Sequence, residues 1–208
     1  LIGLVGSEMC IRDRTTTQEC RYANGKITTD YVYTMDADGS VYFSATYTPE
    51  GQLPPLPCIG NTFLMDKDMT RLSWYGQGLQ DSYVDRLEAT GIGRWTSSVD
   101  QEYVHYPRPQ SSGNHEQTVT LSLTDAKGRG YTVTTANATP FAFSALPYSE
   151  HQLSTVAHDC DLHTENNVFL NIDAAMMGLG NSSCGPGVLT KYSIPQKQHS
   201  LHVMFKRK

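Results

Sequence analysis

Apolar side chains recur at every second position along much of this chain. Between residues 31 and 47 they fall on one face of two segments that D-A-D-G (Asp36–Gly39) separates. The residues on that face are Tyr31, Tyr33, Val41, Phe43, Ala45 and Tyr47. A period of two is typical of a half-buried strand, and Gly39 can supply the positive φ that a tight turn needs. The segment Glu19–Thr48 is therefore predicted to contain a β-hairpin.

A second hairpin is predicted where Thr118–Thr124 and Tyr131–Thr135 alternate on either side of D-A-K-G-R-G. Further short strands are predicted at Phe63–Met65, Met69–Tyr75, Phe141–Ala145, Phe169–Ile172 and Leu201–Phe205. One helix is predicted after Ser149, because Ser149 and Gln152 have the spacing of a capping box and an apolar stripe follows. Many short strands with one short helix indicate an all-β sandwich.

The composition agrees with this fold class and excludes some partners. The chain has 208 residues, enough for one domain or two small ones. Its 12 tyrosines outnumber 6 phenylalanines and 2 tryptophans, as in β-rich proteins whose sheets have one partly solvated face. A net charge of −5 argues against nucleic acid or an anionic membrane as a partner. No apolar run approaches the length of a membrane span.

Five cysteines are widely spaced, without a C-x-x-C pair. An odd number of cysteines in a domain of this size predicts reduced thiols rather than a disulfide scaffold. Reduced thiols in turn predict a cytoplasmic protein.

The first fourteen residues, L-I-G-L-V-G-S-E-M-C-I-R-D-R, lack the basic start and long apolar centre of a signal peptide. The string G-S-E-M-C-I-R-D resembles a translated sequencing adapter. Residues 1–14 are therefore predicted to be a non-native leader. Residues 15–208 are predicted to form the domain, truncated at its N-terminus.

Three strings carry a resemblance to a known family. They are W-Y-G-Q-G-L-Q-D-S-Y-V-D-R (Trp74–Arg86), Y-P-R-P-Q-S-S-G-N (Tyr106–Asn114) and N-I-D-A-A-M-M-G-L-G-N-S-S-C-G-P (Asn171–Pro186). They resemble the C-terminal domain, also called domain 5 or the small chain, of glycoside hydrolase family 2 β-galactosidases. The resemblance reaches from about Pro57 to Phe205.

This resemblance implies an antiparallel β-supersandwich of the galactose-mutarotase-like kind. It also implies a part in hydrolysing terminal β-galactosides such as lactose, by closing the substrate pocket and supporting assembly. In the family, the two glutamates of the retaining mechanism lie in a barrel domain that this chain lacks, and Mg²⁺ and Na⁺ serve that domain. The implied partners are the catalytic domain or large chain, the galactoside, and further copies in a homo-oligomer. No catalytic residue, metal or cofactor is expected in this segment.

One substrate-binding residue is implied by the resemblance. Many family members have at the position of Cys184 a tryptophan that reaches into the catalytic pocket, and others have cysteine in an S-C-G-P context like this one. Cys184 is thus expected to form a wall of the pocket and not to act as a nucleophile. The segment Trp74–Arg86 is expected to be scaffold, with Gly76 and Gly78 permitting a turn and Asp85 and Arg86 pairing with neighbours that hold the loop.

The chain departs from the family at several positions. Cys58 stands where the family's L-P-R-I-G string usually has arginine, and Ser111 replaces an acidic residue. Leu79 and Asp81 replace a proline and a glutamate. These departures bring any polar network around them into question, but not the fold.

The residue pattern contains two further sets of candidate site residues. The acids Asp81, Asp85, Glu88, Asp100 and Glu102 are available, but a glycosidase needs a facing pair, and surface or ion-paired acids are the simpler interpretation. The residues His158, Cys160 and His163 have metal-ligating side chains, yet their spacing suits no common zinc motif. For them, packing and capping is the preferred interpretation.

Two other classes of protein remain as alternatives. A free-standing carbohydrate-binding module needs an exposed aromatic platform, for which Trp74 and Trp95 are the two indoles, and Trp74 lies in a pattern that predicts burial. An aldose epimerase needs a histidine and a glutamate facing one pocket. His115 and Glu116 are neighbours on a predicted strand, so their side chains should point apart.

Overall fold

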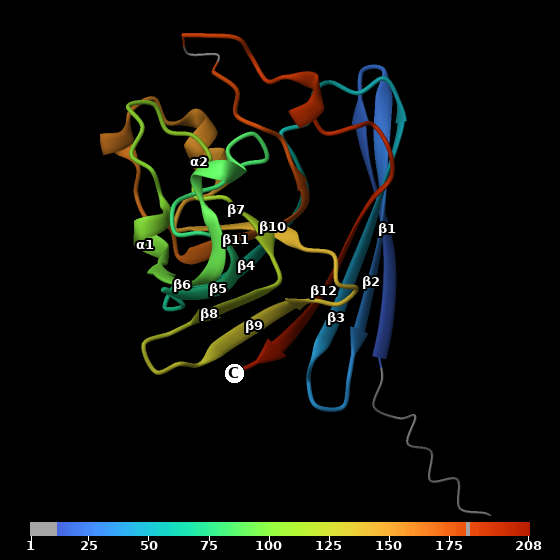
Figure 1. Cartoon of the computed structure of the whole chain (residues 1–208). Helices are drawn as coiled ribbons and strands as arrows, with labels where there is room; N and C mark the ends of the chain where they lie inside the picture. Colours follow the sequence, from blue (N-terminus) through green and yellow to red (C-terminus); the bar gives the residue numbers. More distant parts are fainter. Residues whose placement is uncertain (1–11, 182–183) are drawn as a thin grey trace, which may run out of the picture.

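The computed structural model describes residues 12–181 and 184–208, which form two antiparallel β-sheets (Figure 1). The larger sheet has the order β1 (Arg12–Tyr22), β2 (Gly25–Met35), β3 (Val41–Gly51), β12 (His199–Arg207), β9 (Gly130–Thr135), β8 (Thr120–Thr124), β5 (Arg71–Gly78), β6 (Gly91–Ser98). The smaller sheet has the order β4 (Cys58–Asp66), β11 (Asn167–Met176), β10 (Phe141–Leu146), β7 (His115–Thr118). The prediction of an all-β sandwich is confirmed.

The helices are short, and in the view of Figure 1 α1 and α2 lie on the side away from β1, β2 and β3. The predicted helix is α2 (Glu150–Thr155), and the four-residue α1 (Val99–Glu102) was not expected. The hydroxyl of Ser149 accepts from the Gln152 amide at 3.2 Å, as a capping box requires. The second half of the box is different, because the Ser149 amide donates to Glu165 and not to Gln152.

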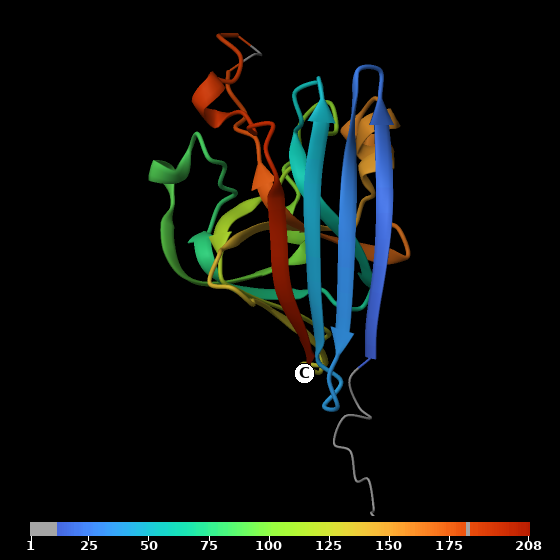
Figure 2. The ribbon, with the colours of Figure 1, turned by 90° about the vertical axis from the view of Figure 1, so that its right-hand side faces the viewer.

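Both predicted hairpins are present. Strands β2 and β3 pair along their length around a turn in which Gly39 has φ +80°, and β8 pairs with β9. Figure 2 shows β1, β2, β3 and β12 as long neighbouring strands. The turn Asp66–Asp68 does not close a hairpin, because it connects β4 of the small sheet with β5 of the large one.

Strand β1 includes part of the predicted leader. Arg12 pairs with Met35 and Arg14 with Tyr33, so residues 12–14 continue the edge strand of the large sheet. The proposed boundary after residue 14 therefore falls inside β1. Residues 1–11 lie outside the described part of the chain, and for them the leader hypothesis stays a prediction.

The core lies between the two sheets and follows the predicted alternation. Its fully buried side chains are Phe43, Leu121, Leu123, Val133, Phe141, Phe143, Leu170, Ile172 and Val203. On β11, Leu170 and Ile172 face this core, so Asn171 and Asp173 project from the opposite, outer face of the small sheet. That outer face carries the polar residues of the site.

Candidate functional site

The glycine-rich loop Gly178–Gly187, here called the Cys184 loop, is tied to a distant part of the chain. The carboxylate of Asp85 accepts a hydrogen bond from the Gly180 amide at 2.8 Å, and Arg86 donates to the Gly180 carbonyl oxygen at 2.9 Å. Gly180 has φ +63°, a conformation that favours glycine. The expectation that Asp85 and Arg86 pair with neighbours is confirmed, and the segment they pair with leads to Cys184.

Cys184 itself lies beyond this anchor. Its amide donates to the Asn181 carbonyl oxygen at 3.1 Å, and the Asn181 amide donates to the Pro186 carbonyl oxygen at 3.0 Å. The residue is exposed and its thiol is free. An exposed side chain on a loop with a fixed base can contact another molecule, and its contact with substrate stays a prediction.

Gly76 and Gly78 serve a different purpose from the one expected. Both lie in β5 rather than in a turn, and neither has a positive φ. A Cβ on Gly76 would lie 2.8 Å from the Thr118 Cα atom, and one on Gly78 would lie 2.7 Å from Trp95 Cδ1. These glycines are required because strand β7 and an indole ring pack directly on the backbone.

Gly76→Ala is therefore expected to destabilise the chain by about 1–3 kcal/mol, the usual cost of overpacking. Gly91→Ala in the neighbouring strand β6 is the matched control, because nothing lies within 4 Å of its would-be Cβ. Thermal unfolding of both variants measures the difference. Equal midpoints for the two variants would refute the packing explanation.

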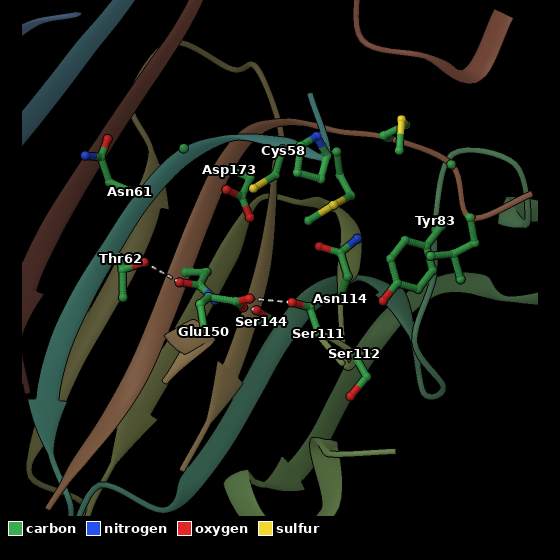
Figure 3. Close-up of a pocket in the computed structure, with 17 residues that line it drawn as sticks. Cys58, Asn61, Thr62, Tyr83, Ser111, Ser112, Asn114, Ser144, Glu150 and Asp173 are labelled. Atoms are coloured by element: carbon green, nitrogen blue, oxygen red, sulfur yellow. Dashed lines mark hydrogen bonds between the residues drawn. The ribbon is translucent and has the colours of Figure 1, made fainter. Parts of the chain in front are cut away.

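A cavity of about 270 Å³, here called the β11 cavity, opens on the outer face of the small sheet beside the base of the Cys184 loop (Figure 3). Its lining comes from β4, β10 and β11, from the segment after Tyr106, and from α2. The lining residues are Pro57, Cys58, Gly60, Asn61, Thr62, Tyr83, Ser111, Ser112, Asn114, Ser144, Glu150, Asn171, Asp173, Met176, Met177, Gly178 and Leu179.

Asp173 is the most deeply placed charged group of this cavity. It is 3 % exposed and lies over Gly60, whose would-be Cβ would clash with the Asp173 carboxylate. Burial raises the pKa of Asp173 to about 8, and the nearby carboxyls of Glu116 and Glu150 add to the shift. Sequence analysis did not single out Asp173, although an acid directly after Ile172 in an apolar strand was a usable signal.

Cys58, where the family string has arginine, lines the same cavity. Although the residue is in part exposed to solvent, desolvation within the cavity raises the pKa of its thiol to about 12, and the Asp173 charge adds to the shift. The departure at Cys58 thus leaves a neutral thiol, and no guanidinium, next to a buried carboxyl.

Asn114 completes the polar wall. Its Nδ2 donates to the Ser82 carbonyl oxygen at 2.7 Å and to Glu116 at 3.1 Å, while its buried Oδ1 has no hydrogen-bond partner among the described residues. Burial raises the pKa of Glu116 to about 7. At the departure Ser111, the hydroxyl donates to the Glu150 carboxylate at 2.5 Å.

The five acids considered from the sequence do not converge. Asp85 holds the Cys184 loop, and Glu102 is 2.6 Å from Nε2 of the fully buried His115. Burial raises the pKa of Asp81. Glu88 and Asp100 are exposed at the surface. The expectation of no catalytic residue in this segment remains a prediction.

The two alternative classes find little support in the geometry. His115 packs between Trp74 and Phe143, with ring centroids 4.3 and 5.1 Å away, and does not line the β11 cavity. Glu116 does not line that cavity either, so the two side chains do not face each other there. Trp74 is 3 % exposed and Trp95 is half-buried, so neither indole forms an exposed platform.

Metal-ligating side chains are dispersed over the described residues, where no group of three or more could hold a metal ion. Cys160 belongs to a 3-10 turn (Asp159–Asp161), and the amide of His163 donates to Gln152, in line with the capping interpretation. Of the five cysteines, the four in the described ranges are free. None of the helices within those ranges could cross a membrane.

The sequence of this chain matches a known protein family. The family described as "Beta galactosidase small chain" matches residues 6–205 of this chain. The chain therefore belongs to the β-galactosidase small chain family.

The chain is also similar to proteins named β-galactosidases. The chain is 35 % identical over 186 residues to the β-galactosidase BgaC of Bifidobacterium adolescentis, covering 87 % of this chain and 17 % of that protein. It is 34 % identical over 148 residues to a β-galactosidase of Streptococcus thermophilus, covering 71 % of this chain and 14 % of the relative. It is 32 % identical over 151 residues to the β-galactosidase of Kluyveromyces lactis, covering 73 % of this chain and 14 % of that protein. The chain thus spans a small part of each relative.

Proposed function

We propose that this chain is the small-chain or C-terminal part of a β-galactosidase that hydrolyses terminal β-galactosides such as lactose. Its family and the names of its relatives support the proposal. The bond is cleaved with retention by two glutamates of the partner catalytic domain, a geometry that needs carboxyl groups about 5 Å apart. The cofactors of that reaction belong to the same partner domain.

The contribution of this chain is to close the substrate pocket with the Cys184 loop. The observation that carries this role is the pair of hydrogen bonds from Asp85 and Arg86 to Gly180, which fix the base of the segment that leads to the exposed Cys184. Such anchoring reduces the entropy that the loop loses on contact with a ligand. In the complete enzyme, the partners are the catalytic domain or large chain and further copies of the protomer, in the cytoplasm.

The test replaces Cys184 in the enzyme assembled from this chain and its catalytic part. Cys184→Trp is expected to shift KM for lactose, or the partition between water and sugar acceptors, by a few-fold, because an aromatic face stacks on the apolar C–H surface of a sugar. Cys184→Ser is expected to be close to neutral. Steady-state kinetics and product analysis measure both effects.

Cys20→Trp is the matched control, since Cys20 is an equally free, exposed cysteine on the edge strand β1. It should leave KM unchanged. If Cys184→Trp behaves like this control, the loop does not reach the substrate. If a folded Cys184→Ser enzyme loses all activity, the thiol takes part in the chemistry and the wall assignment is wrong.

A further inference from the structure

Two acceptor side chains of the β11 cavity have oxygens without a hydrogen-bond partner among the described residues. The Asp173 carboxylate receives no side-chain or backbone hydrogen bond from the described residues, and Asn114 Oδ1 has none either. Both residues are more than nine-tenths buried and line the cavity. Figure 3 shows Asp173 beside Cys58, and Asn114 between Asp173 and Tyr83. Both side chains can therefore accept a hydrogen bond from a ligand in the cavity.

The neutral groups of the cavity are hydrogen-bonded to one another, and none of them donates to Asp173 among the described residues. Thr62 donates to Asn171 Oδ1 at 2.6 Å, and Asn171 Nδ2 donates to the Ser144 hydroxyl at 3.0 Å. The Ser111 hydroxyl is engaged by Glu150, and the Ser112 hydroxyl accepts from the Val104 amide. These contacts form a polar floor that leaves Asp173 without a partner.

The charge of the cavity has one sign. Asp173 and Glu150 line it, and no lysine, arginine or histidine does so among the described residues. Burial favours the neutral form of Asp173, and a cation in the cavity would stabilise its ionised form, which a neutral ligand could not do. An anionic ligand would be repelled. The chemistry that fits is a small planar or tetrahedral cation with several N–H donors.

We propose that the β11 cavity binds a guanidinium or primary ammonium group, with Asp173 as its counter-ion and Asn114 Oδ1 as a second acceptor. The group is either that of a small solute or that of an arginine or lysine side chain from the catalytic part of the enzyme. Both present the same chemistry to the same acceptors.

Cys58 gives an internal test of this proposal. Cys58 and Gly60 are two residues apart on β4, so their side-chain positions share a face, and Asp173 lies over Gly60. An arginine at position 58 would therefore carry a guanidinium toward the Asp173 carboxylate. Cys58→Arg is expected to occupy the site from within the chain.

Binding should depend on pH through Asp173. Its titrating neighbours are Glu116 on β7, Glu150 on α2, Cys58 on β4 and Tyr47 on β3, and none of them is cationic. A cation binds the ionised carboxylate, which is the minor form below a pKa of about 8. The affinity should rise at least about tenfold between pH 6 and pH 9, and binding should lower the pKa of Asp173.

The experiment titrates methylguanidinium chloride, at concentrations below those that denature, into the full 208-residue chain at pH 8.5. The readouts are the carboxyl ¹³C shift of Asp173 and the thermal midpoint, which rises when a ligand binds the folded state. A saturable shift in both is expected. Asp173→Asn should abolish both responses, and Asp100→Asn, at an exposed acid, should retain them.

Cys58→Arg should lower the pKa of Asp173 and abolish methylguanidinium binding, while Cys58→Ser should keep it. Adding the catalytic part distinguishes the two sources: displacement of methylguanidinium identifies a partner side chain, and simultaneous binding identifies a solute. The proposal is overturned if no saturable response occurs, or if Asp173→Asn responds as the unaltered chain does. A saturable response to galactose without one to methylguanidinium would also overturn it.

Discussion

Purified on its own from a host without β-galactosidase, the 208-residue chain is expected to hydrolyse no galactoside. Retaining hydrolysis requires an acid and a nucleophile on either side of the scissile bond. Here Asp85 and Glu102 are engaged in structural contacts, and the cavity carboxyl of Asp173 is buried over the small sheet. A chromogenic galactoside assay on the isolated chain measures the result.

The positive control is the same preparation assembled with its catalytic part, which should be active. Turnover by the isolated chain that disappears in Asp173→Asn or Glu150→Gln would locate the catalytic carboxyls in this domain. The small-chain proposal would then fail. The proposed cation site would still be tested separately, by the methylguanidinium titration.

The second large effect is expected at the buried pair of Glu102 and His115. Glu102→Leu removes the carboxylate that lies 2.6 Å from His115 Nε2. The imidazole of His115, which is fully buried, then has no hydrogen-bond partner. Breaking such a pair on one side costs about 3–5 kcal/mol. For a domain of this size, the thermal midpoint should fall by roughly 6 °C or more.

Two variants distinguish the contribution of the hydrogen bond between Glu102 and His115 from the contribution of packing. Glu102→Gln retains an oxygen that can accept from His115, and it should cost less than Glu102→Leu. The double variant Glu102→Leu with His115→Phe replaces the pair by apolar groups beside Trp74 and Phe143, and should recover much of the loss. If the double variant is as unstable as the sum of its parts, the hydrogen bond is not the source of the effect.

Local pattern was a reliable guide to the strands. The hairpins β2–β3 and β8–β9 were predicted because a period of two and a turn glycine are properties of adjacent residues. Strand β6 and helix α1 were missed. In β6, exposed and half-buried positions carry Arg94 and Thr96, so no apolar face marks the strand. In α1, four residues are too few for a helical period to show.

The site was predicted in part. The strings around Trp74–Arg86 and Asn171–Pro186 were both recognised, but their contact through Asp85 and Gly180 joins residues 95 positions apart. The substitution at Cys58 was noted, and its consequence became visible only once β4 paired with β11 and brought Cys58 to the Asp173 carboxyl.

The amino-acid sequence by itself determined the all-β class, the main strands and the family, because alternation, turn residues and motifs are read within short windows. Only the tertiary structure decided that Gly76 and Gly78 admit close packing, that Asp85 and Arg86 hold the Cys184 loop, and that Asp173 is buried without a partner. The physical reason is that burial and desolvation depend on which strands pair across the two sheets. That pairing is a long-range property of the folded chain.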